Sequence, residues 1–162
     1  MALSPFSLEL DSLPLFFRYR DVIFGRGFAA TIETTGRALC VREDDEFVMA
    51  GVEPGGMAAS GATRELAQYA FRKMFTTILF DIAAEEETFD AFKTAVERFV
   101  HQTSPSVIDE WNRAVAASRQ AVGADVNVPR QPADMPASVA IVHTELAPAQ
   151  NILSEPEHLV AA

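Results

Sequence analysis

The chain has 162 residues, of which 49% are hydrophobic, and this is enough for one core of ordinary size in a single domain. Its 13 basic and 23 acidic residues give a net charge of −10, which opposes nonspecific nucleic-acid binding and favours a basic partner. A single cysteine excludes an internal disulfide and fits a reducing compartment. No apolar run is long enough to cross a membrane, and the N-terminus lacks the features of a signal peptide. We therefore expect a cytoplasmic protein.

The first part of the chain predicts an arm followed by a sheet. Residues 1–15 carry two prolines and scattered leucines, which indicate an N-terminal arm. From residue 16 to 48, apolar residues alternate between turn signals at 25–27, 35–36 and 43–45, so we expect an antiparallel meander of three or four strands. Several arginines in this region are typical of the solvated face of such a sheet: Arg18, Arg20, Arg26, Arg37 and Arg42.

Residues 51–84 predict the long helix on which the sheet packs. A short strand at 56–60 lies between glycines, and Thr63 can then cap a helix that begins near Arg64. Apolar residues follow at helical spacing, in the order Leu66, Ala67, Ala70, Phe71, Met74, Phe75, Ile78, Leu79 and Ile82. Tyr69 and Phe80 lie outside this stripe, and we interpret them as contacts to another helix or another chain.

Two more helices and a tail complete the predicted α+β architecture. Thr88 is a candidate cap for the second helix, and Ser104 with Pro105 is typical of the start of a third helix that stops at Gly123. Residues 16–123 are then one domain, and the proline-rich segment 124–162 is expected to be an irregular, flexible tail. Within this tail, residues 139–142 could form a strand that adds to a sheet edge or docks on a partner, or they could have no role.

The sequence predicts neither an enzyme nor a metal or cofactor site. The three histidines His101, His143 and His158 lack metal-ligand spacing, and the sequence contains no Walker loop, Rossmann fingerprint or nucleophile elbow. Cys40 lies among apolar and β-branched residues and is expected to be a small buried hydrophobe.

One short motif resembles a known family. Pro54-Gly55, followed by Gly61-Ala62-Thr63-Arg64-Glu65-Leu66-Ala67 at the helix start, is similar to the pattern of HicB-like antitoxins, with residues of about 36–84 covered. The resemblance implies a degenerate RNase H-like domain without nuclease activity. It also implies a partner, a small basic RNA-cleaving toxin that the chain would neutralise, and assembly into homo-oligomers. The residues that carry the motif are Pro54, Gly55, Gly61, Thr63, Glu65 and Ala67.

Two other functions remain open. The chain could be a structural protein that forms an oligomer through its long helix, for which Tyr69 and Phe80 are the evidence. It could also bind a small ligand in a pocket between the sheet and the helix, lined by Phe, Met and Tyr side chains.

Overall fold

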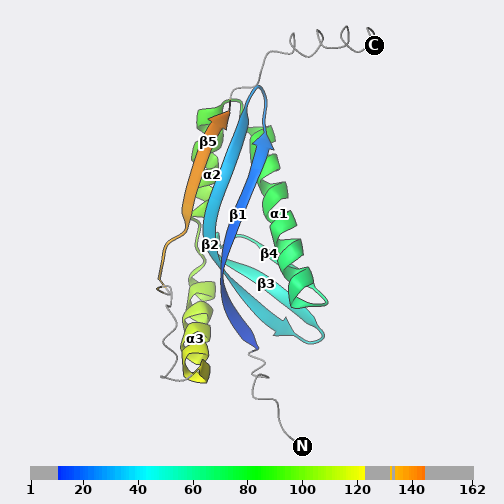
Figure 1. Cartoon of the computed structure of the whole chain (residues 1–162), viewed down its shortest axis with the longest axis vertical. Coiled ribbons are helices and arrows are strands. Elements are labelled where there is room, and N and C mark those ends of the chain that lie inside the picture. Colours follow the sequence, from blue (N-terminus) through cyan, green and yellow to red (C-terminus); the bar gives the residue numbers. More distant parts are fainter. Residues whose placement is uncertain (1–10, 123–131, 133, 145–162) are drawn as a thin grey trace, which may run out of the picture.

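The computed structural model describes residues 11–122, 132 and 134–144, which form one sheet and three helices (Figure 1). The strands are β1 (Ser12–Phe24), β2 (Ala29–Glu43), β3 (Glu46–Glu53), β4 (Ala58–Gly61) and β5 (Ser138–Thr144). The helices are α1 (Arg64–Glu85), α2 (Phe89–Val100) and α3 (Pro105–Val122). The predicted α+β class is confirmed, since an antiparallel sheet packs on one long helix that is followed by two more helices.

The sheet is organised around β2. β1 pairs with residues 29–41 of β2, from Ser12 opposite Val41 to Phe24 opposite Ala29. The other edge of β2 has two partners in succession, because residues 29–35 pair with β5 and residues 37–43 pair with β3. β4 then pairs with β3. Within the described part of the chain, the second edge of β1 has no strand paired to it, and we call it the open edge of β1.

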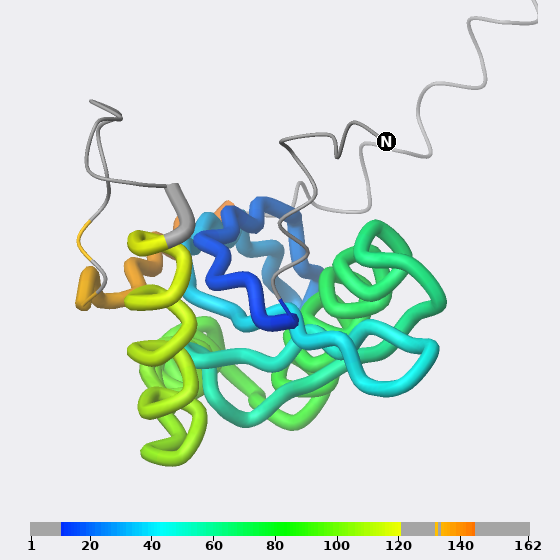
Figure 2. The backbone as a smooth tube through the Cα atoms, turned by 90° about the horizontal axis from the view of Figure 1, so that it is seen from below, coloured from blue at the N-terminus to red at the C-terminus, as the bar shows by residue number. Residues whose placement is uncertain are grey.

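Helices cover both faces of the sheet. Consecutive residues of β2 point to opposite faces, so Ala38 joins the main core with α1 and α2, while Leu39 joins a smaller core. Trp111 of α3, which is fully buried, lies at the centre of this smaller core. Figure 2 shows the result, with α1 on one side of β1 and α3 on the other.

α1 and α2 begin at their predicted capping residues, and α3 begins at Pro105 as predicted. The Thr63 hydroxyl accepts a hydrogen bond of 3.1 Å from the Leu66 N–H, and the Thr88 hydroxyl accepts one of 3.2 Å from the Ala91 N–H. α1 buries a narrower stripe than the sequence predicts: Ala67, Phe71, Phe75, Leu79 and Ala83. Leu66 and Met74 were expected in this stripe, but they are 52% and 36% exposed.

The structure differs from the sequence prediction at three places. The turn predicted at 35–36 does not occur, and β2 continues through Gly36. Glycine is required there by close packing, since a Cβ atom would lie 2.5 Å from the Glu53 carbonyl oxygen and from the Phe17 ring. β1 begins at Ser12, inside the range predicted as an arm. β5 lies inside the range predicted as a flexible tail. It pairs with the edge of β2, so the prediction that residues 139–142 could form a strand that adds to a sheet edge is confirmed. Residues 1–10, 123–131, 133 and 145–162, which include Gly123 and His158, lie outside the described residues.

Candidate functional site

A groove with a volume of about 400 Å³ separates β1 from the first part of α1, and we call it the β1–α1 groove. Residues 15–19 of β1 form one wall, and Met49 of β3 also lines the groove. The opposite wall consists of α1 side chains, namely Glu65, Gln68, Tyr69, Phe71, Arg72 and Phe75. The groove therefore runs along the open edge of β1 and has a helix on its far side.

The floor of the groove is aromatic and already packed. The ring of Phe17 meets the rings of Phe71 and Phe75 edge to face, with centroid separations of 5.4 and 6.1 Å. Phe71 and Phe75 are 3% and 1% exposed, so they belong to the core as much as to the groove. Tyr69 stands on the wall and is 67% exposed. A side chain that entered the groove would thus meet a rigid floor and one movable aromatic wall.

One end of the groove is closed by a contact between the strand and the helix. The hydroxyl group of Tyr19 lies 2.8 Å from Oγ1 of Thr76, and the Arg72 guanidinium lies 5.4 Å from the centre of the Tyr19 ring. Burial raises the pKa of the Tyr19 phenol, and the nearby Asp21 acts in the same direction, while the Thr76 hydrogen bond and Arg72 oppose them. The phenol is therefore neutral near pH 7 and holds the two elements together as an uncharged group.

The open edge of β1 offers backbone hydrogen-bonding groups along this groove. Alternate residues of an antiparallel strand direct their N–H and C=O groups to opposite edges, so about half of those in β1 face away from β2. Charged side chains often protect such an edge from uncontrolled pairing, and Arg18, Arg20 and Asp21 lie in the middle of β1. The strand can accept an extended segment, but it disfavours indiscriminate association.

The groove is locally basic although the chain as a whole is acidic. Arg18 and Arg72 are both exposed, and within residues 11–122, 132 and 134–144 neither forms an ion pair with a carboxylate. Glu65 is the single acidic residue of the lining. An approaching segment therefore encounters two cationic side chains beside an apolar floor.

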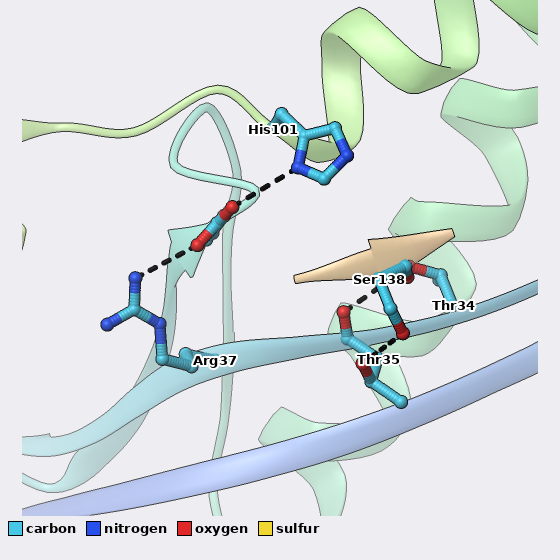
Figure 3. A network of polar contacts seen from close by, with 6 residues as sticks. Thr34, Thr35, Arg37, His101 and Ser138 are labelled. Atoms are coloured by element: carbon cyan, nitrogen blue, oxygen red, sulfur yellow. Dashed lines mark hydrogen bonds and ion pairs between the residues drawn. The ribbon is translucent and has the colours of Figure 1, made fainter. Parts of the chain in front are cut away.

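A second polar feature, shown in Figure 3, joins two buried side chains of the sheet to the half-exposed His101. Nη2 of Arg37 donates a hydrogen bond of 2.9 Å to Oε2 of Glu53, and Oε1 of the same carboxylate lies 3.3 Å from Nδ1 of His101. Arg37 and Glu53 are 8% and 6% exposed, and the Arg37 guanidinium lies 5.7 Å from the centre of the Trp111 ring. Both oxygens of Glu53 are thus engaged by protein groups, so this cluster joins β2, β3 and the connection from α2 to α3.

A second hollow, of about 390 Å³, lies where β1, β2 and the start of β5 meet. Its hydroxyl groups are already satisfied within the protein, since Oγ1 of Thr35 lies 2.6 Å from Oγ of Ser138, and Thr34 donates to the Ser138 carbonyl oxygen at 2.6 Å (Figure 3). These contacts attach β5 to β2. The hollow therefore marks the junction of β5 with the sheet.

Four residues of the predicted motif lie around the start of α1, whereas Pro54 and Gly55 lie beside the connection from α2 to α3. Thr63 is the N-cap and Ala67 is fully buried, while a Cβ atom on Gly61 would lie 2.5 Å from the Ala67 nitrogen. Pro54 is fully buried, and the Gly55 N–H donates to the Gln102 carbonyl oxygen at 2.8 Å. Glu65 lies in the first turn and is the one motif residue that lines the groove.

The two residues predicted to contact a partner are both exposed on α1, but they have different positions. Tyr69 lines the β1–α1 groove, whereas Phe80, which is 41% exposed, is not part of its lining. Cys40 is 2% exposed, which confirms it as a buried residue, and burial raises the pKa of its thiol. Sequence reasoning missed the open edge of β1 and the contact between Glu53 and His101, because both depend on tertiary pairing.

The fold and the groove define an α+β protein with an open sheet edge beside a helix. In the part of the chain that the structure describes, no three His, Cys, Asp or Glu side chains come together as metal ligands. None of the described helices combines the length and the hydropathy that crossing a membrane requires. Comparison of the chain with protein-family models, curated proteins and solved structures found no match.

Proposed function

We propose that this chain is a cytoplasmic, non-catalytic interaction protein that binds a protein partner along the open edge of β1. The observation that carries the proposal is the juxtaposition of a 13-residue edge strand with the β1–α1 groove. Peptide recognition by strand addition uses these two parts, because backbone hydrogen bonds supply affinity and a neighbouring groove supplies specificity.

The motif at the start of α1 favours a particular partner, a small basic RNA-cleaving toxin that the chain would neutralise. The net charge of −10 would attract a basic protein at long range. An exposed acidic group lies at the tip of the β2–β3 hairpin, made of Glu43, Asp44, Asp45 and Glu46. Steering by such charges depends on salt, whereas a buried contact patch largely determines dissociation.

The test is co-purification of the tagged chain with the product of the neighbouring reading frame, followed by an assay of RNA cleavage by that product. We expect capture and inhibition of cleavage by the unmodified chain. Tyr69→Asp should abolish capture, because it places a charge at the groove wall. Phe80→Asp is the matched control, since it makes a similar change on the same helix outside the groove, and it should retain capture.

Surface plasmon resonance then tests the electrostatic part of the proposal. Raising the ionic strength from about 0.05 to 0.5 M shortens the Debye length from roughly 14 to 4 Å, and association should slow by about an order of magnitude. Dissociation should change much less. Association that is independent of salt, or the absence of any captured partner, would overturn the antitoxin form of the proposal.

Self-assembly is a second candidate, supported by the apolar side chains that α1 leaves exposed. Leu66, Tyr69, Met74 and Phe80 are each at least 36% exposed, and a helix that contacted a second copy could cover them. Sedimentation of the purified chain at several concentrations tests this candidate.

A small-ligand function has the volume of the groove in its favour, because about 400 Å³ is within the usual range of ligand pockets.

A further inference from the structure

We propose that the β1–α1 groove selects an extended segment in which apolar side chains alternate with carboxylates. This inference rests on the strand addition in the proposed function and specifies the local chemistry of the one segment that pairs with β1, whereas the long-range attraction depends on the net charge of the whole partner. Its basis is the two-residue period of a strand: a segment paired with the open edge of β1 points alternate side chains to the two faces of the sheet. The two faces of the sheet therefore impose separate requirements on the bound segment.

The face toward α1 requires apolar side chains. Leu15, Phe17 and Tyr19 of β1 share this face, and Phe71 and Phe75 complete the floor beneath them. Residues 15–19 extend for about 16 Å at the usual rise per residue, so two or three inward side chains of an added strand fit along the groove. The contact between Tyr19 and Thr76 marks the end of this apolar stretch.

The opposite face requires carboxylates. Phe16, Arg18 and Arg20 point to this side of β1, and a strand added at the open edge would place side chains directly beside them. Arg20 has Glu33 as its cross-strand neighbour on β2, whereas the neighbour of Arg18 is the uncharged Thr35. A carboxylate beside Arg18 would therefore supply an opposite charge that β2 does not provide.

A second copy of β1 fits this edge poorly. If two β1 strands paired antiparallel about a two-fold axis near their middle, Arg18 and Arg20 of one copy would lie opposite or next to the same residues of the other. Like charges in neighbouring cross-strand positions are destabilising, and charged residues on an edge strand limit this kind of association. The observed charges consequently favour a segment of different sequence that carries acidic residues.

The test is a titration of the full chain, labelled with nitrogen-15, with synthetic peptides followed by NMR. The first probe is the acetylated, amidated peptide Leu-Glu-Phe-Glu-Leu-Glu, and its partner has lysine in place of each glutamate. We expect the acidic peptide to bind about tenfold more tightly and to shift the amide signals of residues 15–19. Two further acidic peptides carry N-methyl groups on alternate residues, and one of them should lose binding because only one set of N–H groups faces β1.

Arg18→Glu should reverse the preference, so that the lysine peptide binds more tightly than the glutamate peptide. Lys93→Glu makes the same change of charge at an exposed site on α2 and should leave the preference unchanged. Equal affinity for the two N-methylated peptides, or no binding of any peptide, would overturn the inference of strand addition. Equal binding of acidic and basic peptides would overturn the charge inference alone. The proposed function is tested separately by partner capture and its dependence on Tyr69.

Discussion

The hydroxyl group of Tyr19 lies 2.8 Å from Oγ1 of Thr76, and this contact joins the edge strand β1 to the helix α1. Thr76 in turn donates to the Arg72 carbonyl oxygen at 3.2 Å, one turn earlier in the same helix. The tyrosine ring also packs against Phe75, with the ring centres 4.5 Å apart. The open edge of β1 is therefore held at a fixed distance from α1, and the groove between them is formed before any ligand binds.

The buried phenol of Tyr19 makes stability depend on pH in the alkaline range. The pKa of Tyr19 is raised above its ordinary value of 10.0, chiefly by burial. A raised pKa means that the folded state favours the neutral form, so this contribution is fully present below pH 10 and is lost as the pH rises through the higher folded-state value. We expect the free energy of unfolding to fall more steeply above pH 10 for the unmodified chain than for Tyr19→Phe. Urea melts between pH 8 and 11 measure this, and parallel curves would contradict it.

Phe75 should contribute much more to stability than Phe80. Phe75 is 1% exposed and packs against three aromatic rings, those of Phe17, Tyr19 and Phe99. Phe75→Ala should lower the free energy of unfolding by roughly 3–5 kcal/mol, because it leaves a cavity in the main core. Phe80→Ala makes the same change at a position that is 41% exposed, and it should have a clearly smaller effect. Equal losses in urea melts would mean that α1 is rotated from the observed orientation.

Gly36 should be intolerant of substitution although it lies in the middle of a strand. A Cβ atom would lie 2.5 Å from both the Glu53 carbonyl oxygen and the Phe17 ring, so Gly36→Ala should destabilise the fold by roughly 1–3 kcal/mol through overpacking. Gly56→Ala is the matched control, because its nearest neighbour would be the flexible Gln102 side chain at 3.4 Å. Thermal melts of both variants provide the comparison. A well-tolerated Gly36→Ala would show that β2 and the end of β3 are farther apart than the structure places them.

Removal of the Glu53 carboxylate should destabilise the protein because it leaves the buried Arg37 guanidinium without this counter-charge. We expect Glu53→Ala to lower the free energy of unfolding by roughly 3–5 kcal/mol. Glu33→Ala removes a carboxylate from an exposed position of β2 and should change the free energy of unfolding by less than about 1 kcal/mol. Denaturant melts measure both variants. The double substitution Arg37→Met with Glu53→Leu should recover most of the loss, and failure to recover would point to a role beyond charge pairing.

Local signals in the sequence predicted the elements that depend on local chemistry. Thr63 and Thr88 were recognised as caps because the first turn of a helix has unsatisfied N–H groups, and Pro105 fits the first position of α3 for the same reason. The hairpin turn at 25–27 was predicted from its glycines, and Gly27 has a positive φ of 75°. The fold class followed from these signals together with the alternation of the strands.

The groove could not be predicted in this way because it depends on contacts between distant segments. The sequence indicated that Tyr69 lies outside the apolar stripe of α1, but it did not reveal that β1 lies beside this part of the helix. The sequence predicts a turn at Gly36, whereas the structure shows that glycine is required there by a close backbone approach. These two requirements cannot be distinguished from the local sequence. The ion pair of Arg37 with Glu53 likewise arises from the register between β2 and β3.

The pairing of β5 with β2 has a consequence for the order in which the protein is made. β2 is complete once residue 43 has been synthesised, but the strand that covers its first half begins only at residue 138. At about 5–20 residues per second, the ribosome needs roughly 5–20 s to make the intervening chain. During this interval residues 29–35 have β1 on one side and no strand on the other. A nascent chain that stalls before residue 138 therefore exposes a second site for aggregation or chaperone binding, which the finished protein covers.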